Sequence, residues 1–170
     1  MRHTCYAWLL LIGAPELLYA QGAIPAARWS SHPAIRAVRA IVQGIDRHPE
    51  RLVRRSDSAT CGFPYISVTA DLHSDSTGRV RKYHLDRGTD DSAGEATYYY
   101  DTHGMVRFAF TTQNAVNGTR QEQRAYYDST GVLLRRVSRR LAGPGYPNGW
   151  PDEPIRDPRS DFTHLCGSAK

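Results

Sequence analysis

One short turn sequence occurs three times in the middle of this 170-residue chain and constrains its fold more than any other feature. The copies are DSTG at 75–78, DTHG at 101–104 and DSTG at 128–131, spaced 26 and 27 residues apart. The aspartate can accept backbone hydrogen bonds within such a turn, and the glycine tolerates a positive φ at its end. Strand-forming residues flank each copy. We therefore predict three β-hairpins: 64–74 with 79–87, 95–100 with 105–113, and 119–127 with 132–141.

The first of these strands also shows the periodicity of a half-buried sheet. Ile66, Val68, Ala70 and Leu72 alternate with polar residues, so that one face of the strand is apolar. The loops at 90–94 and 114–118 would connect the three hairpins. The simplest topology is a six-stranded antiparallel meander over 64–141.

Apolar residues at helical spacing precede the sheet. They are Ile35, Val38, Ile41, Val42 and Ile45. We predict an amphipathic helix over 33–55 that packs on one face of the sheet, interrupted near Pro49 and continued by a second short helix. A basic helix lying on a membrane surface is the alternative. A helix combined with a meander sheet gives the α+β class.

The two ends of the mature chain are predicted to be irregular. Residues 21–32 form a flexible lead-in, and residues 142–170 form a tail rich in proline and glycine. The length suits one domain, which we place at 33–170.

The first 20 residues have the features of a secretory signal peptide. A basic start is followed by an apolar run over 6–12, and the segment ends in Leu18-Tyr19-Ala20. The apolar run is too short to span a bilayer of roughly 30 Å. We therefore predict export, to the periplasm or the extracellular space, and no stable membrane anchor after cleavage.

Cleavage would remove Cys5 and leave one pair of cysteines, Cys61 and Cys166. An even pair in an exported protein predicts a disulfide bond. The bridge would close a loop of about 105 residues, worth on the order of 4–5 kcal/mol in the chain-entropy description. Two free, buried thiols are the alternative.

Two segments carry a resemblance to known proteins. The sequence EATYYYD at 95–101 is followed by GMVRF at 104–108, and EQRAYYD at 122–128 is followed by GVLLR at 131–135. This paired pattern resembles one found in small exported bacterial proteins of unassigned function. The resemblance implies an N-terminal helix followed by an antiparallel sheet, and it brings no catalytic residue with it.

Patterns for catalysis and metal binding are scarce. His73 and His84 would lie four residues apart along the first hairpin, too far to share a metal. The acidic residues within 86–95 could offer oxygen ligands to calcium, but their spacing fits no EF-hand. His164 and Cys166 could form a thiolate pair, which a disulfide would remove. We predict no catalytic residue, no metal site and no cofactor.

Tyrosines just before the turns and arginines just after them form a candidate binding surface, because strand alternation places some of them on one face. Both residue types are over-represented at protein interfaces and suit stacking on sugars or bases. The alternative is a structural role, in which the tyrosines are present because they favour β-strands and the arginines cover the rim of the sheet. The candidate binding residues are Tyr98, Tyr100, Arg107, Arg124, Tyr126 and Arg135.

Together these features favour an exported, non-enzymatic protein whose Tyr/Arg-rich sheet face contacts a protein or an envelope polymer. The net charge of +5 and a pI of about 9.3 favour a partner of acidic character. The alternative is a hydrolase of a cell-envelope polymer with an unrecognised carboxylate pair, which requires a cleft with convergent Asp or Glu residues of perturbed pKa. Nucleic acid is not expected as a partner, because export removes the usual ligand.

Overall fold

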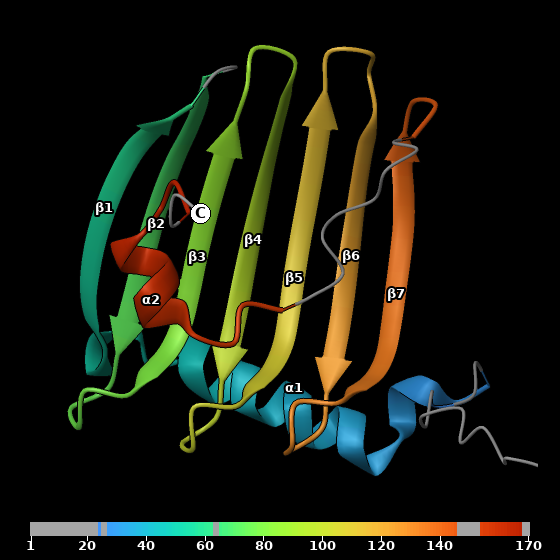
Figure 1. Ribbon diagram of the computed structural model, residues 1–170. Helices are drawn as coiled ribbons and strands as arrows, with labels where there is room; N and C mark the ends of the chain where they lie inside the picture. Colours follow the sequence, from blue (N-terminus) through green and yellow to red (C-terminus); the bar gives the residue numbers. More distant parts are fainter. Residues whose placement is uncertain (1–23, 25–26, 63–64, 146–153, 168–170) are drawn as a thin grey trace, which may run out of the picture.

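The computed structural model describes residues 24, 27–62, 65–145 and 154–167. Its main element is one seven-stranded antiparallel sheet, in which the strands follow each other in sequence order (Figure 1). The strands are β1 Val53–Cys61, β2 Ile66–Ser74, β3 Val80–Gly88, β4 Ser92–Tyr100, β5 Val106–Ala115, β6 Arg120–Tyr127 and β7 Leu133–Ala142. The helices are the 3-10 turns η1 Trp29–Ser31 and η2 Pro49–Arg51, the helix α1 Pro33–Asp46 and the short helix α2 Pro158–Thr163.

The three predicted turns connect β2 to β3, β4 to β5 and β6 to β7, and the three predicted hairpins are confirmed. In the first turn, the Gly78 amide donates to the Asp75 carbonyl at 2.8 Å, and Asp75 Oδ1 accepts from the Thr77 amide at 3.0 Å. The other two turns repeat these bonds. The closing glycines have φ of 79°, 82° and 81°, which favours glycine at these positions. The repeat therefore fixes the local geometry as well as the hairpins.

The predicted fold class is wrong. The structure is mostly β, with seven strands where we expected an α+β fold with six. The helix expected over 33–55 ends at Asp46, and 53–61 forms a strand instead. The proline at position 49 stops the helix, and the predicted second helix is reduced to one 3-10 turn. The tail, expected to be irregular, contains α2.

Strand β1 escaped prediction because its side chains show no apolar alternation. Most of them are exposed, as befits a strand at the edge of the sheet. Its conformation comes from pairing with β2 along its whole length, from Val53 opposite Ser74 to Cys61 opposite Ile66. Tertiary pairing therefore decides the structure here, and local sequence preference does not.

One face of the sheet, which we call the α2 face, carries the larger core. Leu72, Tyr83 and Tyr100 are buried there, and Phe162 of α2 packs on them. The predicted disulfide between Cys61 and Cys166 is present, with 5.2 Å between the two Cα atoms. It holds the segment after α2 against the end of β1.

The opposite face, which we call the α1 face, is covered only in part. The helix α1 crosses it at the end that carries the Asp–Gly turns (Figure 1). Ile35 and Val38 pack there against Tyr126, with Phe108 at the margin. Further from the turns several side chains of this face are exposed, among them Thr69, Asp86, Glu95 and Arg139.

The register within the first hairpin differs from the expected one. A bulge beside Ser74 pairs this residue with Val80, so His73 lies opposite Lys82, and His84 opposite Asp71. The two histidines therefore share the α1 face, two residues apart along it rather than four.

The signal-peptide prediction for residues 1–20 lies outside the described residues, as does most of the lead-in. Among the residues that the structure does describe, no helix combines the length and apolar character needed to cross a membrane.

Candidate binding surface

The six predicted binding residues do not form one surface. Tyr98 and Tyr100 lie on the α2 face, where they join the core around Tyr83. The other four lie on the α1 face or at its turn end. Whether any of them binds a partner stays a prediction, but their surroundings differ greatly.

The two tyrosines of the α2 face are structural in their contacts. Tyr100 is fully buried, and its hydroxyl donates to the Ile155 carbonyl at 2.8 Å. Tyr98 stacks on Tyr83 with 6.5 Å between ring centroids. Burial raises the pKa of Tyr98 to about 12. A partner could reach the Tyr100 ring only after displacing the C-terminal segment that contains Ile155.

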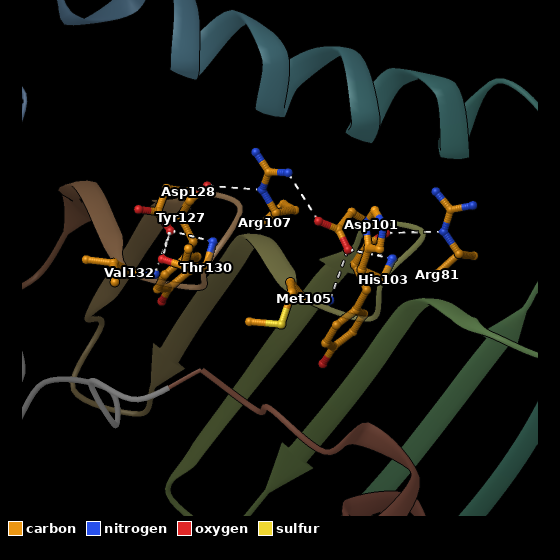
Figure 2. A network of polar contacts seen from close by, with 10 residues as sticks. Arg81, Asp101, His103, Met105, Arg107, Tyr127, Asp128, Thr130 and Val132 are labelled. Carbon is orange, nitrogen blue, oxygen red and sulfur yellow. Dashed lines mark hydrogen bonds and ion pairs between the residues drawn. The ribbon is translucent and has the colours of Figure 1, made fainter.

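Arg107 belongs to a network that joins neighbouring turns (Figure 2). Its Nη1 donates to Asp101 Oδ2 at 3.2 Å, and its Nε donates to the Tyr127 carbonyl at 3.3 Å. Its side chain is 12% exposed and that of Asp101 is 10% exposed. Arg81 repeats the arrangement one hairpin earlier, donating to the Tyr100 carbonyl and pairing with Asp75. These guanidinium groups are used to connect one hairpin to the next.

Tyr126 and Arg135 belong to an aromatic cluster under the start of α1. The Tyr126 ring contacts Phe108 and Trp29, with centroids 5.0 Å and 5.6 Å away, and Tyr126 is 4% exposed. Arg135 lies over the Trp29 ring and donates to the Ile24 carbonyl at 3.1 Å. This cluster fixes the N-terminal segment to the sheet.

Arg124 is the predicted residue that remains accessible on the uncovered part of the α1 face. Its side chain is 39% exposed, lies 4.9 Å from the Phe110 ring centroid and pairs with Glu122 at 2.6 Å. Strand pairing puts Arg139 beside Glu122, and Arg120 precedes Glu122 by two residues on the same face. Both of these arginines are exposed.

We call the set Arg120, Arg124 and Arg139 the β6–β7 corner. Arg120 and Arg139 have no ion-pair partner among the described residues. Sequence reasoning singled out neither Arg120 nor Arg139. The signal that could have found them is distance from the turns, since both lie at the far ends of their strands.

Carboxylates occupy a different part of the same face. Asp86 of β3 lies directly opposite Glu95 of β4, and both are exposed. Like charges in this position are unfavourable by a few tenths of a kcal/mol or more. The uncovered part of the α1 face is therefore acidic over β3 and β4 and basic over β6 and β7.

The carboxyl groups bear on the alternative of a hydrolase. A general acid needs a raised pKa. Among the described residues, every carboxyl group with a shifted pKa has it lowered, as in Asp91, where the Thr89 hydroxyl donates to the carboxylate at 2.7 Å. Asp90 and Asp91 line a cavity of about 340 Å³ in the β3–β4 loop region.

Two further cavities lie near the turns. One of about 350 Å³ lies between α1 and the first turn, where Arg81 pairs with Asp75. One of about 220 Å³ lies between the turns and α2, with Arg79 and Arg159 in its lining. Neither is lined by the β6–β7 corner. Within the described ranges, no three His, Cys, Asp or Glu side chains are grouped so that they could hold a metal ion.

No protein-family model, no curated protein and no solved structure matches this chain.

Proposed function

We propose that this protein is an exported, non-enzymatic binding protein, and that its β6–β7 corner contacts a macromolecule of acidic character. The observation that carries the proposal is the exposed position of Arg120 and Arg139, without ion-pair partners among the described residues, on a part of the sheet that no described element covers.

The disulfide supports the exported location. Disulfides persist in oxidising compartments and are rare in the cytosol. The bridge between Cys61 and Cys166 is weakly consistent with the periplasm or the extracellular space as the place where the protein works. Cleavage of the predicted signal peptide after Ala20 belongs to this proposal.

The chemistry of the corner supports an acidic partner. Guanidinium groups donate forked hydrogen bonds that match carboxylates and phosphates. Exposed arginines of a flat surface gain affinity when several act together, and electrostatic attraction raises the association rate. The carboxylates Asp86 and Glu95 would repel a uniformly acidic polymer that covered the whole face. A protein with a limited acidic patch therefore suits the face better than a polyanion.

The position of the corner supports a macromolecular partner over a small ligand. A small-molecule site is usually a concave pocket that covers most of its ligand. The arginines of the corner project from a sheet, and the three cavities described above lie elsewhere. Contact with a large, complementary surface is the use that such an arrangement favours.

The test is capture of partners from a nuclease-treated envelope extract with tagged protein, Arg139→Glu and a matched control, Arg36→Glu. Arg36 is exposed on α1, so both variants change the net charge equally. We expect one partner that the wild type and Arg36→Glu capture at physiological salt and that Arg139→Glu loses. Equal capture by all three proteins would count against the corner as the binding site.

A further inference from the structure

The outer edge of β7 has no further strand paired with it among the described residues. This ten-residue strand ends the sheet, and it contains four arginines and no acidic residue. An edge strand exposes unpaired backbone N–H and C=O groups, which can accept another strand. Edge strands that bind peptides in this way use backbone hydrogen bonds for affinity and side chains for specificity.

One contact already uses this edge. The Ile24 amide donates to the Leu134 carbonyl at 3.1 Å, and Arg135 donates to the Ile24 carbonyl at 3.1 Å. Among the described residues, Ile24 is alone in hydrogen-bonding its backbone to the outer side of β7. The start of the edge therefore accepts a chain segment, and the part after Leu134 lies further along the same edge.

The other edge of the sheet differs in charge. In β1, Arg54 pairs with Asp71 at 2.8 Å, and Asp57 lies in the strand itself. Positive charge on β1 is therefore partly cancelled. On β7, Arg139 and Arg140 project to opposite faces of the strand. Arg140 already donates to the Pro144 carbonyl at 2.8 Å, whereas Arg139 has no ion-pair partner among the described residues, so Arg139 is the main cation that an added strand would meet.

We propose that the edge of β7 beyond Leu134 binds an extended acidic segment of a partner protein as an added strand. The inference rests on the proposed function and specifies the partner that the β6–β7 corner would contact. Side chains directly opposite each other on paired strands lie about 5 Å apart, so a glutamate on the added strand could reach Arg139 or Arg140. The neighbouring Arg120 would extend the basic surface along β6.

Protection of the edge is the competing role for these arginines. Charged side chains on an edge strand discourage unwanted pairing. An edge arginine repels a strand that carries positive charge, and pairing with an apolar strand would bury the arginine's charge at a cost in free energy. Neither effect opposes a strand rich in glutamate, so the two roles make different predictions for an acidic peptide.

The experiment compares two capped eight-residue peptides of equal charge, (Glu-Thr)₄ and (Glu-Pro)₄, binding to the ¹⁵N-labelled full chain. Proline removes every second amide donor and disfavours strand pairing. We expect (Glu-Thr)₄ to bind at least tenfold more tightly, and the amides that become protected from exchange to lie in β7. Arg139→Glu should weaken this binding, and Arg36→Glu should leave it unchanged.

The outcomes separate this inference from the proposed function. Equal affinity for the two peptides, or protection outside β7, would overturn strand addition while leaving an electrostatic contact at the corner in place. No binding of (Glu-Thr)₄ at millimolar concentration would also overturn it. The proposed function is judged separately, by whether Arg139→Glu loses the partner captured from the envelope extract.

Discussion

The two ends of the sheet use arginine in opposite ways. At the turn end, Arg81 and Arg107 donate to main-chain carbonyls of the next hairpin and pair with turn aspartates. At the other end, Arg120 and Arg139 are exposed. The difference follows from position relative to the turns, because Arg81 and Arg107 lie at the bulges after the first two turns, where each reaches the next hairpin. A count of arginines therefore overstates the surface available to a partner.

The largest expected effect is at the turn end. Arg107→Leu leaves the Asp101 carboxylate buried without its cation, which typically costs about 3 kcal/mol or more. We expect a loss of about 3 kcal/mol in the free energy of unfolding, measured by urea denaturation at pH 7.

The double variant Arg107→Leu/Asp101→Asn is the control for this effect. It removes the uncompensated charge and keeps an oxygen that can accept from the His103 amide. Part of the lost stability should return. If Arg107→Leu unfolds at the same urea concentration as the wild type, the structural role of the turn arginines is wrong.

A second test concerns the tyrosines, which sequence reasoning had placed with arginine on a binding surface. Burial raises the pKa of Tyr98 from its ordinary value of 10.0 to about 12. The neutral ring therefore stabilises the fold fully below pH 10, and this contribution is lost as the pH rises toward 12. A shift of this size corresponds to about 3 kcal/mol in full, of which about 2 kcal/mol is lost between pH 9 and pH 11.5.

Denaturation at pH 9 and pH 11.5 measures this contribution. The wild type should lose about 2 kcal/mol more stability between the two pH values than Tyr98→Phe does. Tyr65→Phe, at an exposed position, should behave like the wild type. An identical pH dependence for all three proteins would mean that Tyr98 is accessible to solvent, and would return it to the list of candidate contact residues.

A smaller effect is expected at the turn aspartates. The pKa of Asp128 is below its ordinary value of 3.8, because the Thr130 hydroxyl and two backbone amides donate to it and outweigh the effect of burial. Its ionised form therefore stabilises the fold above pH 4, and this contribution is lost as the pH falls below that value. We expect Asp128→Asn to lose about 1 kcal/mol at pH 7.

Comparison of the urea midpoints of Asp128→Asn and the wild type at pH 7 and pH 3 checks this effect. The difference between the two proteins should be smaller at pH 3, because the stabilisation by the ionised carboxylate is lost as the pH falls below about 4. A difference that stays constant or grows on acidification would contradict the lowered pKa.

The sequence predicted the hairpins and the disulfide but not the distribution of side chains between the two faces. The turns depend on chemistry within four residues, the Asp acceptor and the Gly φ, so they could be recognised locally. The face occupied by a residue depends on bulges such as the one beside Tyr100, which shift the register by one residue and leave no sequence signal. Strand β1 was missed for a related reason, since an exposed edge strand needs no apolar pattern.

The smallest expected effect is at the open end of the sheet. Arg139→Leu removes an exposed guanidinium that has no ion-pair partner among the described residues, so its free energy of unfolding should stay within about 0.5 kcal/mol of the wild-type value. The measurement is the same urea denaturation used for Arg107→Leu, which makes the two substitutions a matched pair. A loss above about 1 kcal/mol would show that Arg139 supports the fold, and the contrast between the two ends would fail. Unchanged stability of Arg139→Leu, together with loss of the captured partner by Arg139→Glu, is the combination that only a binding role for Arg139 explains.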